Sequence, residues 1–252
     1  MPRYLTFALV APMASFGAIA VGERRSGWDR PARSAVFGLI GACLGLERED
    51  DAAQEALVEH YSLAILCHAS GNLLADYHTT QVPSSKRGRR FATRAEELAQ
   101  PDLNTVLSRR DYRTGAWHLG AVWPLGNTCR WSLEELSDAM QNPVFAPYIG
   151  RKSCPLGLPL GPRIAEAADV VSALLERHQS GLEATLVVPS GQTLRSVLAD
   201  RPAEAIVAMD ATPETAVDPR HLRTEFRRDQ PRSRRRWQFD LRPEALLSAG
   251  TP

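Results

Sequence analysis

The sequence predicts an α+β fold in which helices cover one β-sheet. Three observations lead to this prediction. An apolar segment near the N-terminus has the period of a strand, a glycine-bearing apolar helix follows it, and two further strands and a capped helix come next. The chain has 252 residues, of which 44% are hydrophobic, enough for a sizeable core. One more strand would complete a ferredoxin-like (RRM-like) βαββαβ core.

The first predicted strand covers residues 4–11. Leu5, Phe7 and Leu9 alternate with other residues, which is the period of a strand with one buried face. The uncharged stretch continues to residue 22, so a secretory signal peptide is an alternative. Pro12 would interrupt a helix through this stretch, and no later run is long and apolar enough for a transmembrane helix. These two facts favour the strand.

Two helices are predicted next. The first covers residues 35–44 with Ser34 as its cap, and the second, which is acidic, covers residues 51–60. Gly38 and Gly41 lie on one face of the first helix, which indicates close packing of this helix on a sheet. The alternative is a phosphate site at the helix N-terminus, beside Arg33 and Ser34.

The middle of the chain is predicted to form strands around a long excursion. Residues 61–69 and 72–81 have the composition of strands, with a reversal at residues 70–72. Residues 82–104 are rich in turn residues and bases, and residues 105–125 indicate a strand, a turn and a second strand. Ser132 and Glu135 have the spacing of a capping box, which begins a helix that ends near Gln141.

A Gly/Pro-rich segment around residues 148–162 predicts a boundary. We therefore expect a ferredoxin-like domain over residues 1–160, with an inserted thumb hairpin at about 82–108. Residues 161–252 are expected to form a smaller C-terminal α/β extension. Its predicted elements are a helix at about 165–178 and strands at 184–188 and 205–209.

Charge is unevenly distributed, although the net charge is only +1. Residues 47–59 contain six acids and one arginine, residues 86–94 contain five bases and no acid, and residues 223–236 contain seven arginines. Several basic pairs or triplets precede an aromatic residue, as in Arg109-Arg110 before Tyr112 and Arg234–Arg236 before Trp237. Arginines bind phosphates and aromatic rings stack on bases, so single-stranded RNA is the predicted ligand. A solvated charged surface is the alternative for any one cluster.

Signals for catalysis are weak. Tyr77 and His78 could serve metal-independent RNA cleavage, in which one group takes the proton from a 2′-hydroxyl. The six histidines and four cysteines show no metal-ligand spacing, so neither a metal nor a cofactor is expected. The cysteines are interpreted as reduced thiols.

Four stretches, taken in order, resemble the CasD family, the RAMP-type subunits that hold the 5′ handle of the guide RNA in the type I-E CRISPR complex Cascade. The stretches are APMASFG (11–17), RPARSAVFGLIGACLGLERED (30–50), DYHTTQ (76–81) and PYIGRKSCPLGLPL (147–160). The last of them is the most distinctive. The resemblance covers roughly residues 4–160.

The resemblance implies a cytoplasmic, non-catalytic protein of antiviral defence that binds the crRNA and caps one end of a ribonucleoprotein complex. The implied partners are a CasC-type backbone subunit, a CasA-type large subunit and, indirectly, target DNA, with no membrane. In a related subtype the corresponding protein cuts the repeat RNA itself, so an endoribonuclease that uses Tyr77 and His78 remains the alternative. The predicted RNA-binding residues are Arg25, Arg33, Ser34, Tyr77, His78, Gln81, Lys86, Arg109, Arg110, Arg151, Lys152 and Ser153.

Overall fold

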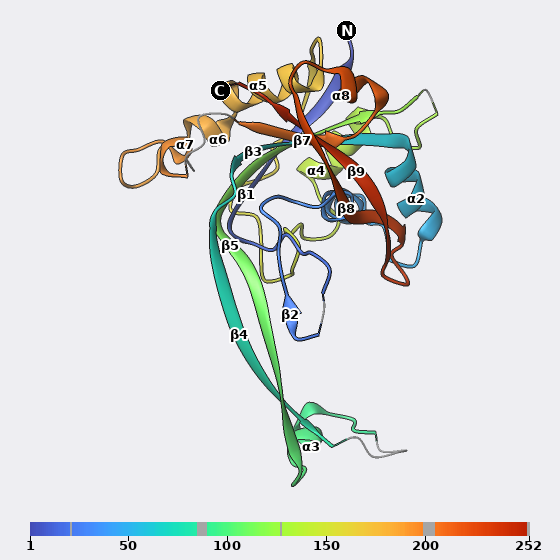
Figure 1. Cartoon of the computed structure of the whole chain (residues 1–252), viewed down its shortest axis with the longest axis vertical. Helices are drawn as coiled ribbons and strands as arrows, with labels where there is room; N and C mark the ends of the chain where they lie inside the picture. The colour runs from blue at the N-terminus through green and yellow to red at the C-terminus, as the bar shows by residue number, and fades with distance from the viewer. Residues whose placement is uncertain (21, 85–89, 127, 199–204, 251–252) are drawn as a thin grey trace.

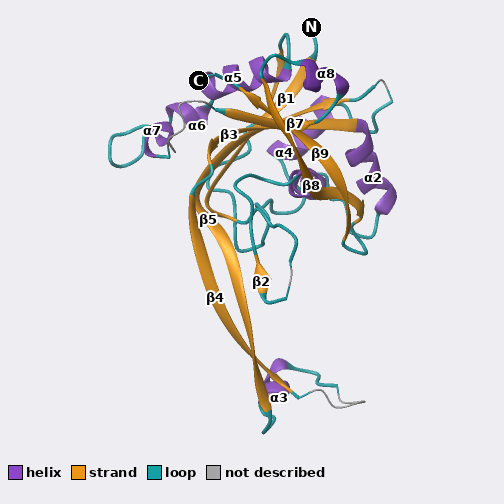
Figure 2. Cartoon of the chain, in the orientation of Figure 1, coloured by secondary structure: helices purple, strands orange, loops and turns teal. Residues whose placement is uncertain are grey.

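The computed structural model describes residues 1–20, 22–84, 90–126, 128–198 and 205–250. The strands in these ranges are β1 (Arg3–Ala14), β2 (Arg24–Arg25), β3 (Tyr61–Ala69), β4 (Asn72–Pro83), β5 (Leu103–Pro124), β6 (Arg163–Glu166), β7 (Ile206–Asp210), β8 (His221–Ser233) and β9 (Gln238–Ser248). The helices are α1 (Arg33–Cys43), α2 (Asp51–His60), α3 (Arg94–Leu98), α4 (Leu133–Gln141), α5 (Val170–Ser180), α6 (Leu182–Thr185), α7 (Leu194–Val197) and α8 (Pro213–Val217). The fold is thus mixed α/β (Figure 2).

All of these strands belong to one sheet. Its main path runs in the order β6-β1-β5-β3-β7-β9-β8, and β2 and β4 also pair with β5. The pairs along the path are antiparallel, whereas β2 runs parallel to β5. The short strand β6 pairs with β1 at one end of this path. Strands from both the N-terminal and the C-terminal parts of the chain therefore share the sheet.

The body of the sheet is buried on both faces. Leu5, Phe7 and Leu9 of β1 join an apolar cluster with α1, α2 and α4, whereas Ala8 and Val10 join a second cluster with α5. The prediction of one buried face was wrong because α5 covers the other face. This helix begins later than predicted, since residues 163–166 form β6. The sheet also extends beyond this body.

That extension is a long two-stranded ribbon, the thumb (Figure 1). β5 is one continuous strand, and both β3 and β4 run antiparallel to it, β3 beside its inner half and β4 beside its outer half. The predicted reversal at residues 70–72 and the predicted turn within 105–125 were therefore wrong. Gly71 and Gly115 have φ angles of +73° and +70°, so the glycines there allow the irregular backbone at the point where the ribbon leaves the body. The ribbon begins at Asn72 and ends at α3.

Local signals placed the helices well. The bounds predicted for α2 are those observed, and the capping box of Ser132 and Glu135 begins α4 as predicted. Ser34 does not cap α1, because this helix already starts at Arg33, after Ala32. Gly38 does not face the sheet: a Cβ built on it would lie 2.8 Å from Nη1 of Arg234. Its small size therefore makes room for an arginine side chain.

The C-terminal part adds β7, β8 and β9 to the sheet. The predicted strand at 205–209 corresponds to β7, but the one predicted at 184–188 was wrong, since α6 ends at Thr185 and Val187 forms only an isolated bridge with Thr193. The β8–β9 hairpin forms the far side of the sheet (Figure 1). Among the helices that the structure describes, none combines the length and apolarity needed to cross a bilayer.

A buried histidine predicts an acid-sensitive fold. His118 is fully buried in β5, and neither of its ring nitrogens has a hydrogen-bond partner among the described residues. Burial lowers its pKa to about 3, and the positive charge of neighbouring side chains adds to the effect. Below pH 6.5 the unfolded chain binds a proton at this position that the folded chain does not, so stability falls as the pH falls. Between pH 6.5 and 4.5 the loss should reach about 2.5 kcal/mol.

Denaturant unfolding of the chain and of His118→Leu at both pH values measures this loss. The variant should lose less stability on acidification, whereas His221→Gln, at the start of β8, should behave like the parent. Equal acid sensitivity in His118→Leu and the parent would show that other groups cause the effect.

Candidate nucleic-acid interface

The root of the thumb is a three-stranded segment in which arginines from two distant parts of the chain meet. β2 pairs with β5 so that Arg24 lies opposite Arg109 and Arg25 opposite Arg110. On the other side of β5, Tyr77 of β4 lies opposite Arg109. The backbone N–H of Arg109 donates to the carbonyl oxygen of Glu23 at 3.0 Å, which adds to this pairing.

Strand pleating distributes these arginines over both faces of the root. Directly opposed residues share a face, and successive residues alternate. Arg24 and Arg109 therefore project from one face, and Arg25 and Arg110 from the other. Arg24, Arg25 and Arg109 are exposed, and Arg110 is half-buried. A strand of RNA that wraps the root would meet positive charge on either side.

The loop over residues 148–155 brings a third basic segment to the root. The Nη1 of Arg151 donates to the carbonyl oxygen of Asp111 at 3.1 Å, and its guanidinium lies over the ring of Tyr112, 4.5 Å from the centroid. These two contacts fix the guanidinium beside β5, and its remaining N–H groups are still free to bind an anion. Lys152 and Ser153 follow on the same loop and are exposed. The predicted residues Arg109, Arg110 and Arg151 thus lie together.

The backbone of this loop depends on Gly150. Its φ angle is +88°, and a Cβ built on it would lie 1.7 Å from the carbonyl oxygen of Ser15. The loop also receives a hydrogen bond from the N–H of Ser15 to the carbonyl oxygen of Ile149. The end of β1 therefore holds the loop closely, and this position accepts only glycine.

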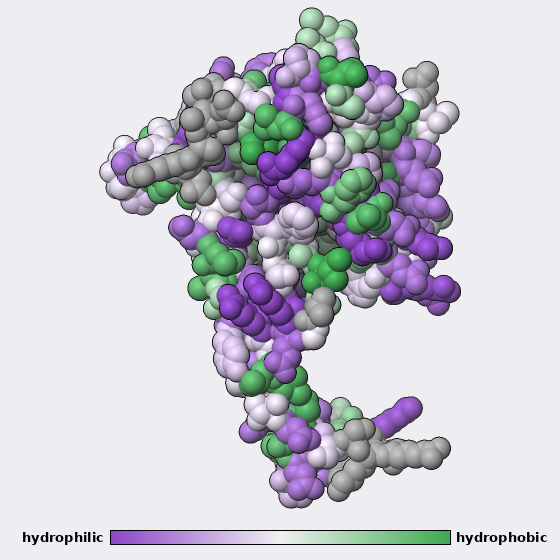
Figure 3. All heavy atoms as spheres, viewed as in Figure 1, coloured by the Kyte–Doolittle hydropathy of each residue, from purple (hydrophilic) through white to green (hydrophobic). Residues whose placement is uncertain are grey.

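Two carboxylates lie among the bases of the root. Asp111 is 5% exposed, and its Oδ1 lies 3.5 Å from Nε of Arg109. Asp76 lies opposite Arg110 and is hydrogen-bonded to Nε2 of His78. Glu23, which precedes Arg24, is a third acid here. Six bases accompany these three acids, so the root has a net positive charge, and Figure 3 shows hydrophilic residues gathered where the thumb leaves the body. The bases are Arg24, Arg25, Arg109, Arg110, Arg151 and Lys152.

Arg24 was missed by sequence reasoning. It lies in a two-residue strand within a charged loop, and neither its period nor its neighbours distinguish it from solvated charge. Its adjacency to Arg25 was the available signal. The pairing of β2 with β5, which gives both residues their place at the root, depends on chain segments more than eighty positions apart.

Tyr77 and His78 do not share a face of the thumb. They are neighbours on β4, so their side chains project from opposite faces of the ribbon. His78 instead contacts Asp76 on its own face, and Tyr77 is 64% exposed. An exposed ring in this position could stack on a base.

One predicted residue, Gln81, lies further along the thumb. Gln81 is exposed on β4, opposite Thr105, and its carbonyl oxygen accepts a hydrogen bond from Arg94. Lys86 lies outside the described residues. Gln81 is therefore part of the ribbon rather than of its root.

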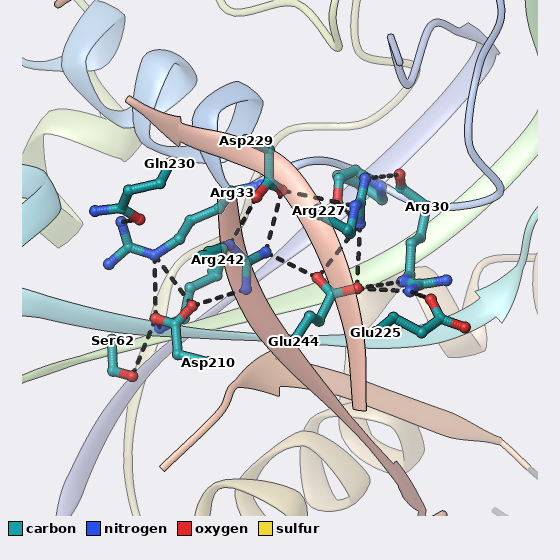
Figure 4. A network of polar contacts seen from close by, with 12 residues as sticks. Arg30, Arg33, Ser62, Asp210, Glu225, Arg227, Asp229, Gln230, Arg242 and Glu244 are labelled. Carbon is teal, nitrogen blue, oxygen red and sulfur yellow. Dashed lines mark hydrogen bonds and ion pairs between the residues drawn. The ribbon is translucent and has the colours of Figure 1, made fainter. Parts of the chain in front are cut away.

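Arg33 is not available to RNA, and this part of the predicted site was wrong. Its side chain is 5% exposed and its Nη2 donates to the carbonyl oxygens of Val58 and Tyr61 at 2.8 and 2.9 Å. Its Nε lies 3.1 Å from both carboxylate oxygens of Asp210. Figure 4 shows it within a network of buried charges between α1, β3 and the C-terminal hairpin. No pattern in the sequence indicates this network, because its members are distant along the chain.

The predicted phosphate site at Ser34 is also wrong. The backbone N–H of Arg33, which opens α1, donates to Oδ2 of Asp229 at 2.8 Å. A carboxylate of the protein thus occupies the position that an external anion would take. The carbonyl oxygen of Ser34 accepts a hydrogen bond from Arg234.

Nothing in the described ranges suggests a metal centre: no group of three or more His, Cys, Asp or Glu side chains there is arranged to hold an ion.

Comparison with known proteins agrees with this geometry. A family profile described as CRISPR-associated protein (Cas_Cas5) matches residues 4–242. The curated CRISPR system Cascade subunit CasD of Escherichia coli (strain K12) is 31% identical over 189 residues, which cover 72% of this chain and 80% of that protein.

Two solved structures share the fold. A chain of a CRISPR RNA-guided surveillance complex has a TM-score of 0.61 at 20% identity, over 99% of this chain and 91% of that one. A crystal structure of a Cas protein has a TM-score of 0.59 at 21% identity, over 98% and 95% of the two chains. The chain belongs to the CRISPR-associated protein family (Cas_Cas5), which confirms the resemblance seen in its sequence.

Proposed function

We propose that the chain is a non-catalytic, crRNA-binding subunit of a type I-E Cascade, and that the root of the thumb holds the 5′ handle of the guide. Two findings support this proposal: family membership together with the CasD relative, and the meeting of three basic segments at one place. The second of these carries the assignment of the site. Bases from β2, β5 and the 148–155 loop outnumber the three acids there, and a phosphate chain is the ligand that such a surface fits.

The proposed binding geometry uses both faces of the root. Phosphates would contact Arg109 on one face and Arg25 and Arg110 on the other, while Arg151 and Lys152 close over the strand from the 148–155 loop. Tyr77, exposed beside Arg109, would stack on a base at the handle–spacer junction. The ribbon beyond it would press against the guide.

The strand order β6-β1-β5-β3, with helices α1 and α4 in the two crossovers, supports a ferredoxin-like core. We propose a RAMP domain over residues 1–160, completed by β6, with residues 161–252 as an auxiliary region that extends its sheet. The proposed partners are CasC-type and CasA-type subunits and, indirectly, target DNA. The proposed location is the cytoplasm.

The affinity for handle RNA tests the site. The dissociation constant of the double variant Arg110→Gln/Arg151→Gln for a 5′-handle RNA should rise at least about tenfold, since each charge-assisted contact is worth about 1.5 to 3 kcal/mol. The matched control Arg130→Gln/Arg163→Gln removes two arginines outside the root and should change the affinity little. Equal losses in the two variants would remove the root from the interface.

A further inference from the structure

The turn between β8 and β9 contains a strained aromatic residue that the proposed handle site does not use. Trp237 has a φ angle of +51°, the only residue other than glycine with a positive φ in the described ranges, and its side chain is 59% exposed. Bulky side chains rarely adopt this conformation, and such strain is concentrated at functional sites. An exposed tryptophan at a turn does not stabilise the core, so a role in binding is the better explanation of its strained backbone.

The ring of Trp237 lies between a cation and a second aromatic ring. The Cζ of Arg48, from the segment before α2, lies 4.6 Å from the ring centroid. The ring of Phe239 lies 6.0 Å from it, with 34° between the two planes. The turn thus presents a small aromatic platform beside a guanidinium group.

The same turn holds a buried arginine, Arg234, that forms no ion pair with an acid in the described residues. Arg234 donates from Nη2 to the carbonyl oxygen of Ser34, but its Nε is buried without a hydrogen-bond partner in the described structure. Burial lowers its pKa to about 10, and the nearby positive charge of Arg48 acts in the same direction. Gly38 leaves the room for this guanidinium on α1. Arg48 and Arg234 are therefore neighbouring cations, and neither forms an ion pair with a carboxylate in the described residues.

Further positive charge follows on the same turn. Arg235 and Arg236 are exposed, and neither forms an ion pair within the described part of the chain. Of the acids at the start of α2, Asp50 caps that helix, whereas Asp51 accepts a hydrogen bond from Ser233 and so places one carboxylate beside the turn. An anion that approached the turn would meet four arginines, one aromatic platform and this single carboxylate.

We propose that the β8–β9 turn is a second binding site for single-stranded nucleic acid. A base stacks on the exposed side of Trp237 and Phe239, and adjacent phosphates bind Arg235 and Arg236 in the positive field of Arg48 and Arg234. Figure 1 shows this turn at the right of the body, whereas the thumb descends from the left, so the two sites are separate.

Tryptophan fluorescence of the full-length chain, titrated with oligouridylate and oligothymidylate of equal length, tests the site. The parent should show quenching, and Trp237→Asn should lose it and bind about tenfold more weakly, because stacking on one base contributes about that factor. Asparagine tolerates a positive φ, so this variant should unfold at the same temperature as the parent or a higher one. Tighter binding of oligouridylate would assign the site to an RNA strand, and tighter binding of oligothymidylate to a DNA strand.

Two further variants isolate the site. Arg235→Gln/Arg236→Gln should reduce the dependence of log K on log salt by about 1.4, from two phosphate contacts at about 0.7 each. Arg130→Gln is the matched control, since Arg130 also lies over a tryptophan ring, that of Trp131, at 4.8 Å. Arg130→Gln should change neither the affinity nor its salt dependence.

The handle-site variant Arg110→Gln/Arg151→Gln should retain the quenching that depends on Trp237, which separates this proposal from the proposed function. Quenching that persists in Trp237→Asn, or a salt dependence that Arg235→Gln/Arg236→Gln leaves unchanged, would overturn it.

Discussion

Replacing Asp229 with alanine should lower the free energy of unfolding by about 3 to 5 kcal/mol, because it removes one of the few carboxylates that neutralise a cluster of buried arginines. Asp229 is 5% exposed and accepts hydrogen bonds from Nε and Nη2 of Arg242, at 2.7 and 3.1 Å, and from the backbone N–H of Arg33. Its Oδ2 also lies 3.7 Å from Nε of Arg227.

Asp229 is one member of a larger network, so no other acid can replace it without moving. Glu244 already pairs with Arg30, Arg227 and Arg242, and Asp210 with Arg33 and Arg242 (Figure 4). The network joins β8 and β9 to α1 and β3, so its loss should loosen the whole C-terminal hairpin from the core.

Urea unfolding, followed by circular dichroism, measures the effect. Glu134→Ala is the control, since it breaks the exposed ion pair between Arg3 and Glu134 and should change the unfolding midpoint little. A midpoint for Asp229→Ala close to that of the control would mean that the buried charges are not coupled in the way the contacts indicate.

Replacing Gly150 with alanine should weaken handle binding more than the loss of any single root arginine. The added Cβ would lie 1.7 Å from the carbonyl oxygen of Ser15, a backbone atom at the end of β1, and the φ angle of +88° is itself unfavourable for alanine. The 148–155 loop must therefore shift, and Arg151 loses its contacts with Asp111 and Tyr112.

Binding of handle RNA and thermal unfolding should be measured together for Gly150→Ala. Gly17→Ala is a matched control in the neighbouring loop, because a Cβ built at Gly17 meets no atom within 4 Å. We expect a loss of affinity of at least about tenfold in Gly150→Ala, the equivalent of about 1.4 kcal/mol, and none in the control. Parental affinity in Gly150→Ala would show that the position of this loop is unimportant for RNA.

The elements that the sequence predicted well are those defined by neighbouring residues. The capping box of Ser132 and Glu135 begins α4, and the bounds of α2 follow from its charged start and the buried strand after it. Signals from neighbouring residues could not predict the direction of β4. Gly71 is typical of a tight turn, but here it marks an irregularity, and only the pairing of β4 with the outer half of β5 shows that the chain continues outward.

Predictions of individual binding residues were right or wrong for a similar reason. Arginines of the root and arginines of the buried network look alike in a sequence, because the acids that neutralise a buried arginine are distant along the chain. Arg33 and Arg227 are examples: each is almost fully buried, and their carboxylate partners come from β7, β8 and β9. Arg109 and Arg110 were predicted from a basic pair shortly before an aromatic residue, and Arg151 from a basic segment after a glycine. Their meeting at the root is a property of the folded sheet.

The salt dependence of handle binding tests the central claim most directly. The affinity of the full chain for a 5′-handle RNA should be measured over a series of salt concentrations, for the parent and for Arg151→Gln/Lys152→Gln. If both residues neutralise phosphates, the slope of log K against log salt should fall in magnitude by about 1.4, at about 0.7 for each single-strand contact. An unchanged slope together with unchanged affinity would place the guide RNA elsewhere on the protein.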